Sequence, residues 1–87
     1  MKIIARPIEM LVWFTNEGTP NPIRFRMKND DDSLAVIKVD RVLFKENEKL
    51  AGNPMIIFRC QSLINNREVI YELKYEIKTC KWILFKI

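Results

Sequence analysis

The chain has no histidine, and only two cysteines and two glycines among its 87 residues. Histidine is the usual base that activates a catalytic serine or cysteine, so its absence leaves these nucleophiles without a partner. The two glycines, Gly18 and Gly52, stand in unrelated contexts and cannot form a loop that cradles phosphate. We therefore predict that the protein is not an enzyme and has no catalytic residues and no cofactor. The length of the chain predicts one domain, residues 1–87.

Paired cysteines and long apolar runs are also missing. Cys60 and Cys80 form no CxxC pair and, without histidine, supply too few ligands for zinc. The longest apolar run, Met10–Phe14, is far shorter than the ~20 residues that span a membrane. No apolar signal-peptide region follows Met1. We expect a cytoplasmic protein, without membrane association, in which both cysteines are buried free thiols; a disulfide between neighbouring strands is the alternative.

The segment Arg67–Lys78 alternates between apolar and charged side chains. In a strand the apolar set would share the buried face, and it consists of Val69, Tyr71, Leu73, Tyr75 and Ile77. A helix would instead bring Glu68, Glu72 and Glu76 into one row of like charge. The alternation therefore predicts a β-strand with one buried and one solvated face.

Two earlier segments also have strand periodicity. In Pro22–Lys28, three apolar residues are expected on one face and three cations on the other, the apolar set being Ile23, Phe25 and Met27. Ile8–Thr15 is apolar on both faces, which predicts a strand that is central or covered on both sides. Between these strands, the glycine and prolines of residues 17–22 predict a turn.

The rest of the chain predicts further strands joined by short turns. The expected strands are Leu34–Phe44 with a β-bulge or bend near Asp40–Arg41, Met55–Leu63, and Cys80–Ile87, which would lie inside the sheet and pair with the first strand. The expected connections are an acidic turn at Asn29–Ser33, a turn within Glu46–Pro54 with one helical turn at Glu46–Leu50, a two-residue hairpin turn at Asn65–Asn66, and a tight turn at Lys78–Thr79.

These segments amount to five to six antiparallel strands in meander order. Such a sheet leaves two unpaired edges unless it curls shut. We therefore predict an all-β fold, a small antiparallel barrel or strongly curled sheet of the SH3-like or OB-like kind. A flat sheet completed by dimerisation is the alternative.

The charge distribution carries the functional hypothesis. The chain has 15 Lys and Arg against 11 Asp and Glu, and the basic excess lies towards its two ends. If the first and last strands pair, a basic face would gather Arg24, Arg26, Lys28, Lys81 and Lys86, with Trp13 as the stacking residue if it is exposed. Small basic barrels with an exposed aromatic residue bind DNA or RNA in this way. We therefore hypothesise a nucleic-acid-binding accessory protein.

Structural alternatives exist for each of these residues. The cations of Pro22–Lys28 could be the solvated side of an edge strand, where they would block aggregation. Without other signals, Trp13 and Trp82 are both expected in the core. A rival function is a protein–protein interaction module or homodimer, because Ile8–Thr15 and Leu84–Ile87 are apolar on both faces and one sheet surface would need a partner to cover it.

The run Asp30–Asp32 is the remaining candidate for chemistry. Carboxylate oxygens suit magnesium or calcium, but the run lacks the ligand spacing, central glycine and terminal glutamate of an EF-hand loop. Three adjacent carboxylates repel one another, so we expect a solvated acidic turn and no metal site. Only a pocket lined by two close carboxylates would leave a route to catalysis.

Several short segments carry a family likeness. They are Arg6–Glu9, the run Gly18-x-Pro20-x-Pro22 continuing to Arg26, Val39–Leu43, Tyr71–Leu73 and Trp82–Leu84, in this order. Together they resemble a group of small uncharacterised bacterial β-rich proteins, some of which are similar to short domains encoded near translesion-polymerase-like proteins. The likeness spans most of the chain, although the acidic turn Asp30–Asp32 departs from it. It implies a bacterial protein without a catalytic motif and with a DNA-related accessory role.

Overall fold

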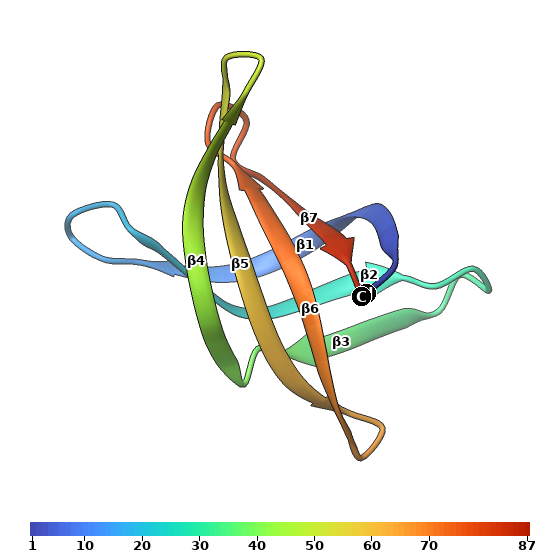
Figure 1. The fold of residues 1–87 in the computed structure, drawn as a ribbon. Coiled ribbons are helices and arrows are strands. Elements are labelled where there is room, and N and C mark those ends of the chain that lie inside the picture. The colour runs from blue at the N-terminus through green and yellow to red at the C-terminus, as the bar shows by residue number, and fades with distance from the viewer.

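The computed structural model describes residues 1–87 and contains seven β-strands and no helix (Figure 1). The strands are β1 (Ile3–Phe14), β2 (Pro20–Lys28), β3 (Leu34–Lys38), β4 (Arg41–Leu50), β5 (Asn53–Ile64), β6 (Arg67–Glu76) and β7 (Lys81–Lys86). The predicted all-β class is confirmed, whereas the predicted number of five to six strands is wrong. No helix is present that is long and apolar enough to cross a membrane.

All seven strands belong to one antiparallel sheet in the order β3-β2-β1-β7-β6-β5-β4. Strands that follow each other in the chain are neighbours, with the single exception of β3 and β4, which form the two edges. The last strand pairs with the first, as predicted, and Lys2 and Ile87 extend that contact through two backbone hydrogen bonds of 2.8 and 3.0 Å. The sheet thus consists of two meanders, β1–β3 and β4–β7, joined through β1 and β7. It is curled into a half-barrel, with β1–β3 crossing behind β4–β6 (Figure 1).

The segment Leu34–Phe44 is two strands rather than one bent strand, and this correction supplies the seventh strand. The chain crosses from one sheet edge to the other at Val39 and Asp40. The Val39 amide donates to the Ile23 carbonyl at 2.9 Å, and Asp40 Oδ2 accepts from the Leu63 amide at 2.7 Å. The two residues therefore bond to opposite layers, which explains the change of phase in the sequence.

The predicted helical turn at Glu46–Leu50 is wrong. These residues belong to β4, which pairs with β5 continuously down to Leu50 and Asn53. The turn itself is confirmed but is shorter than expected, since Ala51 and Gly52 form it with φ of 51° and 79°. The extended ladder with β5 satisfies the backbone groups that a helical turn would have left unpaired.

The hairpin turn at Asn65–Asn66 is confirmed. Both residues have positive φ, 51° and 63°, which is the conformation that a two-residue type I′ turn requires and that asparagine tolerates. The turn before β7 is longer than predicted and covers residues 77–80. Because β6 ends at Glu76, Ile77 lies outside the buried face and is 44% exposed.

The core lies between the two layers of the half-barrel. Its buried cluster is Phe25, Phe58, Cys60, Tyr71, Leu73, Tyr75, Trp82 and Leu84. The predicted inward faces of β2 and β6 are confirmed except for Ile77 and Ile23. Ile23 is 39% exposed because a bulge, where the partners of Leu11 and Val12 skip from Arg24 to Pro22, turns it away from the core.

A buried hydrogen-bonded pair closes the core beside the break between β3 and β4. The Ser62 hydroxyl donates to the Lys38 carbonyl at 2.6 Å and accepts from the Tyr71 hydroxyl. Tyr71 is fully buried, and this burial raises the pKa of Tyr71 to about 12. Burial also raises the pKa of the neighbouring Cys60 thiol to about 12. The pair joins the end of β3 to β5 and β6, where no backbone ladder does so.

The buried phenol predicts a loss of stability in strong alkali. A phenol whose pKa is higher in the folded state contributes fully below its ordinary pKa near 10, and this contribution disappears as pH rises through about 12. The shift corresponds to about 2 to 3 kcal/mol. In a Cys60→Ala background, Tyr71→Phe should be about 1 kcal/mol less stable at neutral pH but lose less stability between pH 10 and 12. Urea unfolding at pH 7 and between pH 10 and 12 measures both quantities, and identical pH profiles would contradict the role given to Tyr71.

Candidate nucleic-acid interface

The outward side of strands β1, β2 and β3 brings exposed aliphatic, aromatic and basic side chains together. Residues directly opposite each other in neighbouring antiparallel strands share a face. The register places Leu11 opposite Arg24 and Arg24 opposite Lys38, while Arg26 lies between Glu9 and Val36. We call this surface the β1–β3 outer face and define it by Leu11, Trp13, Arg24, Arg26, Lys28, Val36 and Lys38.

Trp13 is exposed on this surface, so the expectation that it belongs to the core is wrong. Its exposed fraction is 62%, whereas that of Trp82 is 5%, as predicted for a core residue. Val12 and Phe14 take the inner positions of β1, and the alternation of the strand turns Trp13 outward, opposite Asn21. Trp13 therefore meets the condition on which its predicted stacking role depended.

Two cations of the β1–β3 outer face have no anionic partner. Arg24 and Lys38 lie opposite each other, and neither makes an ion pair. Arg26 Nε donates to Glu9 Oε1 at 2.6 Å, and this hydrogen bond raises the pKa of Arg26. Both partners of that pair are more than half exposed, so the pair stabilises the fold little and a competing anion can replace Glu9.

The alternative interpretation places these cations on the solvated side of an edge strand. Its edge part is wrong, whereas their solvent exposure is as that interpretation expects. β2 is flanked by β1 and β3 and has no free edge. Its arginines therefore do not protect an edge from aggregation. They are exposed on the outward side of an internal strand, which β1 and β3 flank.

The structure does not bring Lys81 and Lys86 to this face. β7 is separated from β2 by β1. Lys86 pairs with Ile3 at the far end of β1, and its Nζ lies 5.6 Å from the centre of the Phe85 ring. Lys81 lies where β7 leaves β1, beside Trp82. Of the predicted site residues, only Trp13, Arg24, Arg26 and Lys28 share one surface.

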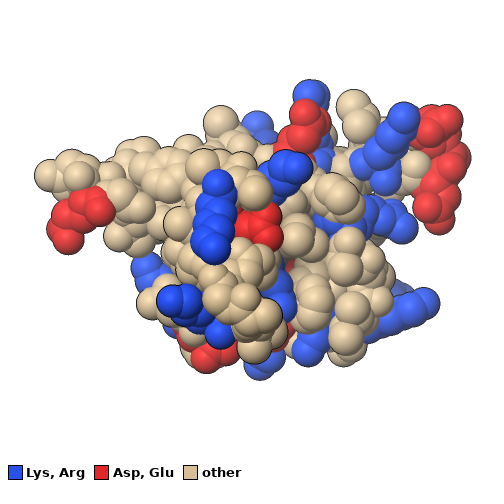
Figure 2. Space-filling model, turned by 90° about the horizontal axis from the view of Figure 1, so that it is seen from above, with Lys and Arg blue, Asp and Glu red and all other residues tan.

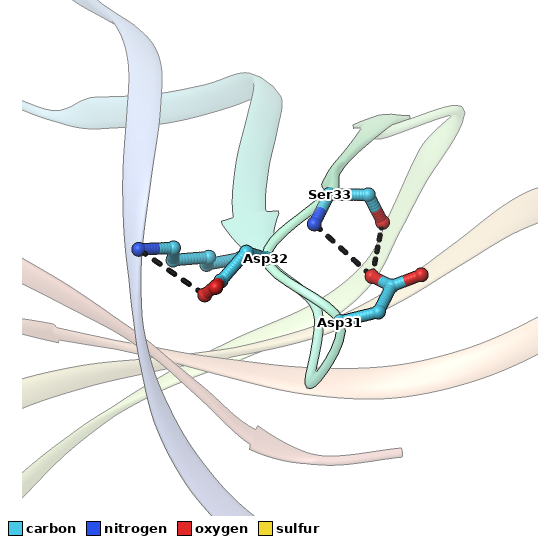
Figure 3. Close-up of polar contacts among 4 residues, drawn as sticks. Asp31, Asp32 and Ser33 are labelled. Atoms are coloured by element: carbon cyan, nitrogen blue, oxygen red, sulfur yellow. Dashed lines mark hydrogen bonds and ion pairs between the residues drawn. The ribbon is translucent and has the colours of Figure 1, made fainter.

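The acidic turn after β2 is held by its own hydrogen bonds and ion pairs (Figure 3). The Ser33 amide and hydroxyl donate to Asp31 Oδ1 at 3.0 and 2.6 Å, which lowers the pKa of Asp31. Asp32 forms an exposed ion pair with Lys28 at 3.4 Å. No three Cys, Asp or Glu side chains come together in a way that could hold a metal ion.

Charges of opposite sign are spread differently over the molecule. In Figure 2 the acidic groups at the right-hand end belong to the β2–β3 turn, while basic groups are distributed over several strands. The β1–β2 hairpin projects to the left and is largely uncharged up to its acidic tip. The basic groups thus do not form one continuous patch in this view.

A second group of charges lies on the outward side of β4–β7. Arg59 Nη2 donates to Glu72 Oε2 at 2.6 Å, and Lys74 Nζ donates to Glu48 Oε1 at 3.1 Å. Lys74 Nζ also lies 3.8 Å from the centre of the Phe85 ring. Each carboxylate is therefore held by a cation, and the two do not form an acid–base pair.

The sequence interpretation missed three members of the β1–β3 outer face, namely Leu11, Val36 and Lys38. The pairing of Arg24 with Lys38 depends on the register of the β2–β3 hairpin, in which paired residues are symmetric about Asp31. A β-hairpin register centred on Asp31, in the predicted acidic turn, would have placed Lys38 opposite Arg24. Leu11 and Val36 follow once that register and the alternation of β1 are known.

Comparisons with known proteins found no match among protein-family models, curated proteins or solved structures.

The two cysteines differ in accessibility, which corrects the expectation that both are buried. Both are free thiols, but only Cys60 is buried, whereas Cys80 is exposed. Cys80 follows the end of β6 in the turn of residues 77–80, so its side chain does not enter the core.

This difference predicts selective modification. A disulfide reagent such as 5,5′-dithiobis(2-nitrobenzoate) should react with one thiol per folded chain at pH 8 and with two after unfolding in guanidinium. Cys80→Ser should abolish the reaction of the folded protein, because burial and the raised pKa of Cys60 keep that thiol protonated and inaccessible. Reaction of two thiols in the folded protein would contradict the burial of Cys60.

Proposed function

We propose that the protein is a non-enzymatic accessory protein that binds single-stranded nucleic acid on the β1–β3 outer face. The observation that carries this proposal is an exposed tryptophan on the same surface as two cations without anionic partners, Arg24 and Lys38. Aromatic rings stack with unpaired bases, and basic side chains attract the phosphates. The geometry therefore favours a single strand over a duplex, whose bases are already stacked on each other.

The spacing of the cations suits an extended backbone. Alternate residues of a strand are about 6.6 Å apart, and neighbouring strands lie about 4.8 Å apart. Arg24, Arg26 and Lys28 thus form a row along β2, and Lys38 widens it onto β3. We assign this half-barrel, as part of the proposal, to the SH3-like or OB-like kind of small barrel. OB-folds bind oligonucleotides on a strand surface of this type.

The proposal also covers the cellular location of the protein and the kind of nucleic acid that it binds. Two free thiols suit a reducing compartment, so we place the protein in the bacterial cytoplasm. The resemblance to short domains encoded near translesion-polymerase-like proteins suggests DNA as the physiological strand.

Titration with a labelled oligothymidylate at low salt tests the proposal. We expect micromolar or weaker binding that falls steeply as salt rises. Trp13→Ala should weaken binding about 5- to 150-fold, since one stacked base is worth roughly 1 to 3 kcal/mol. Arg24→Ala with Lys38→Ala should lower the slope of log K against log salt by about 1.4, the value for two lost contacts with a single strand.

A matched control removes the same charge elsewhere. Lys49 and Arg67 are exposed on β4 and β6, away from the proposed surface. Replacing both by alanine should leave the affinity and the salt slope close to those of the unmodified protein. Equal losses in the two double variants would mean attraction by net charge alone, and no binding at low salt would reject the function.

A second candidate function is homodimerisation through β3. This short strand is a free edge of the sheet, and its Leu34 and Val36 are 58% and 62% exposed. Exposed apolar edge strands readily pair with another chain. Two copies related by a twofold axis would join their β3 strands into one continuous sheet.

Analytical ultracentrifugation from micromolar to millimolar concentration tests this candidate. A dimer is expected, and Val36→Lys should shift it to monomer, since two lysines would then face each other across the new ladder. Leu63→Lys is the control, because Leu63 is 61% exposed on β5, which has no free edge. A monomer at every concentration would reject homodimerisation.

A further inference from the structure

β1 has a stretch of backbone without a ladder partner on one side. It pairs with β7 only as far as Ile8 and Trp82, and with β2 from Glu9 to Phe14. β7 begins at Lys81, one residue before Trp82, so no strand lies beside β1 on this side beyond Ile8. In an antiparallel strand every second residue directs its N–H and C=O to the same neighbour. From Glu9 to Phe14, the groups directed away from β2 therefore meet no strand.

An apolar groove of about 520 Å³ runs beside this open edge. The inner-face side chains of β1 form one wall, namely Met10, Val12 and Phe14. Aromatic rings of β6 and β7 form the floor: Tyr75 lies 4.8 Å from Trp82 and 6.2 Å from Phe14, measured between ring centres. The groove thus combines free main-chain groups with an apolar surface that a side chain can fill.

We infer that this groove binds an extended peptide of a partner protein, which adds to the sheet as a strand beside β1. Only a polypeptide supplies N–H and C=O groups at the spacing of the open edge, and recognition by strand addition uses this match together with pockets for alternate side chains. An antiparallel peptide would continue the ladder that β7 leaves at Trp82. Its alternate apolar side chains would then pack on Val12, Phe14 and Tyr75.

The charges at the groove favour an acidic group at one end of that peptide. Lys81 lines the groove and makes no ion pair within 4 Å, although Glu76 lies opposite it on β6. Glu9, the other charged side chain at the groove, pairs with Arg26. A peptide antiparallel to β1 runs from Phe14 towards Glu9, so its C-terminal end comes to the Lys81 side. The partner segment is therefore extended, apolar at alternate positions, and acidic at its C-terminal end. This site uses the inner face of β1, whereas the proposed nucleic-acid surface uses the outer face. Glu9 borders both, since it lines the groove and pairs with Arg26.

Selection from a phage library of random heptapeptides, followed by fluorescence polarisation with the enriched peptide, tests the inference. The enriched sequences should be apolar at alternate positions and acidic near the C-terminus. Phe14→Glu should weaken binding at least tenfold, because it places a charge in the groove. Lys81→Glu should weaken binding of an acidic peptide and restore it for a peptide whose acidic residue is replaced by lysine.

Phe44→Glu is the matched control, since Phe44 is exposed to 45% and Phe14 to 44% but Phe44 lies on β4. It should leave peptide affinity unchanged. Both Phe14→Glu and Phe44→Glu should bind oligothymidylate as the unmodified protein does, so failure of the peptide site and failure of the nucleic-acid surface are separable. Equal loss of peptide binding in the two phenylalanine variants would overturn the inference.

Amide hydrogen exchange on the unmodified protein locates the peptide without any substitution. Alternate amides between Glu9 and Phe14 should become protected when the enriched peptide binds. Protection confined to the free edges β3 or β4, failure to enrich any peptide, or self-association of the chain through β1 would each overturn the inference.

Discussion

The fold depends on one strand that pairs with two partners over different parts of its length. β1 bonds to β7 through its first half and to β2 through its second half. Because the neighbours diverge, the β1–β3 layer crosses the β4–β7 layer instead of lying flat beside it (Figure 1). The core fills the angle between the two layers, and its members come from β2, β5, β6 and β7. A substitution that disturbs the backbone of β1 would therefore affect both layers.

The same arrangement gives β1 two different faces. Its outward residues, Leu11 and Trp13, are more than half exposed and lie next to the cations of β2. Its inward residues pack against the core and, where β7 diverges, line an open groove. The proposed nucleic-acid surface and the proposed peptide groove therefore lie on opposite sides of one strand. Together the two proposals describe a protein that links a nucleic-acid strand to a protein partner.

Local patterns predicted most of the fold, and long-range pairing accounts for what they missed. The alternation in β6 and the asparagine pair after β5 act over a few residues, so the strand faces and the hairpin turn could be predicted. The break at Val39–Asp40 could not, because its cause is bonding of two adjacent residues to opposite layers. The exposure of Trp13 likewise depends on where the β1–β2 hairpin projects. Arg24, Arg26 and Lys28 were predictable as one face, whereas their neighbour Lys38 required the register of the next hairpin.

The break between β3 and β4 has a mechanical consequence. Strands that are neighbours in the sheet are joined by ladders of backbone bonds, but at this seam the layers are linked mainly by the Ser62 and Asp40 side chains. Few bonds must open there, so local fluctuations should begin at the seam rather than in the continuous ladders of β5 and β6. The two layers would then separate at the seam by rotating about β1, and the ladders within each layer would stay intact.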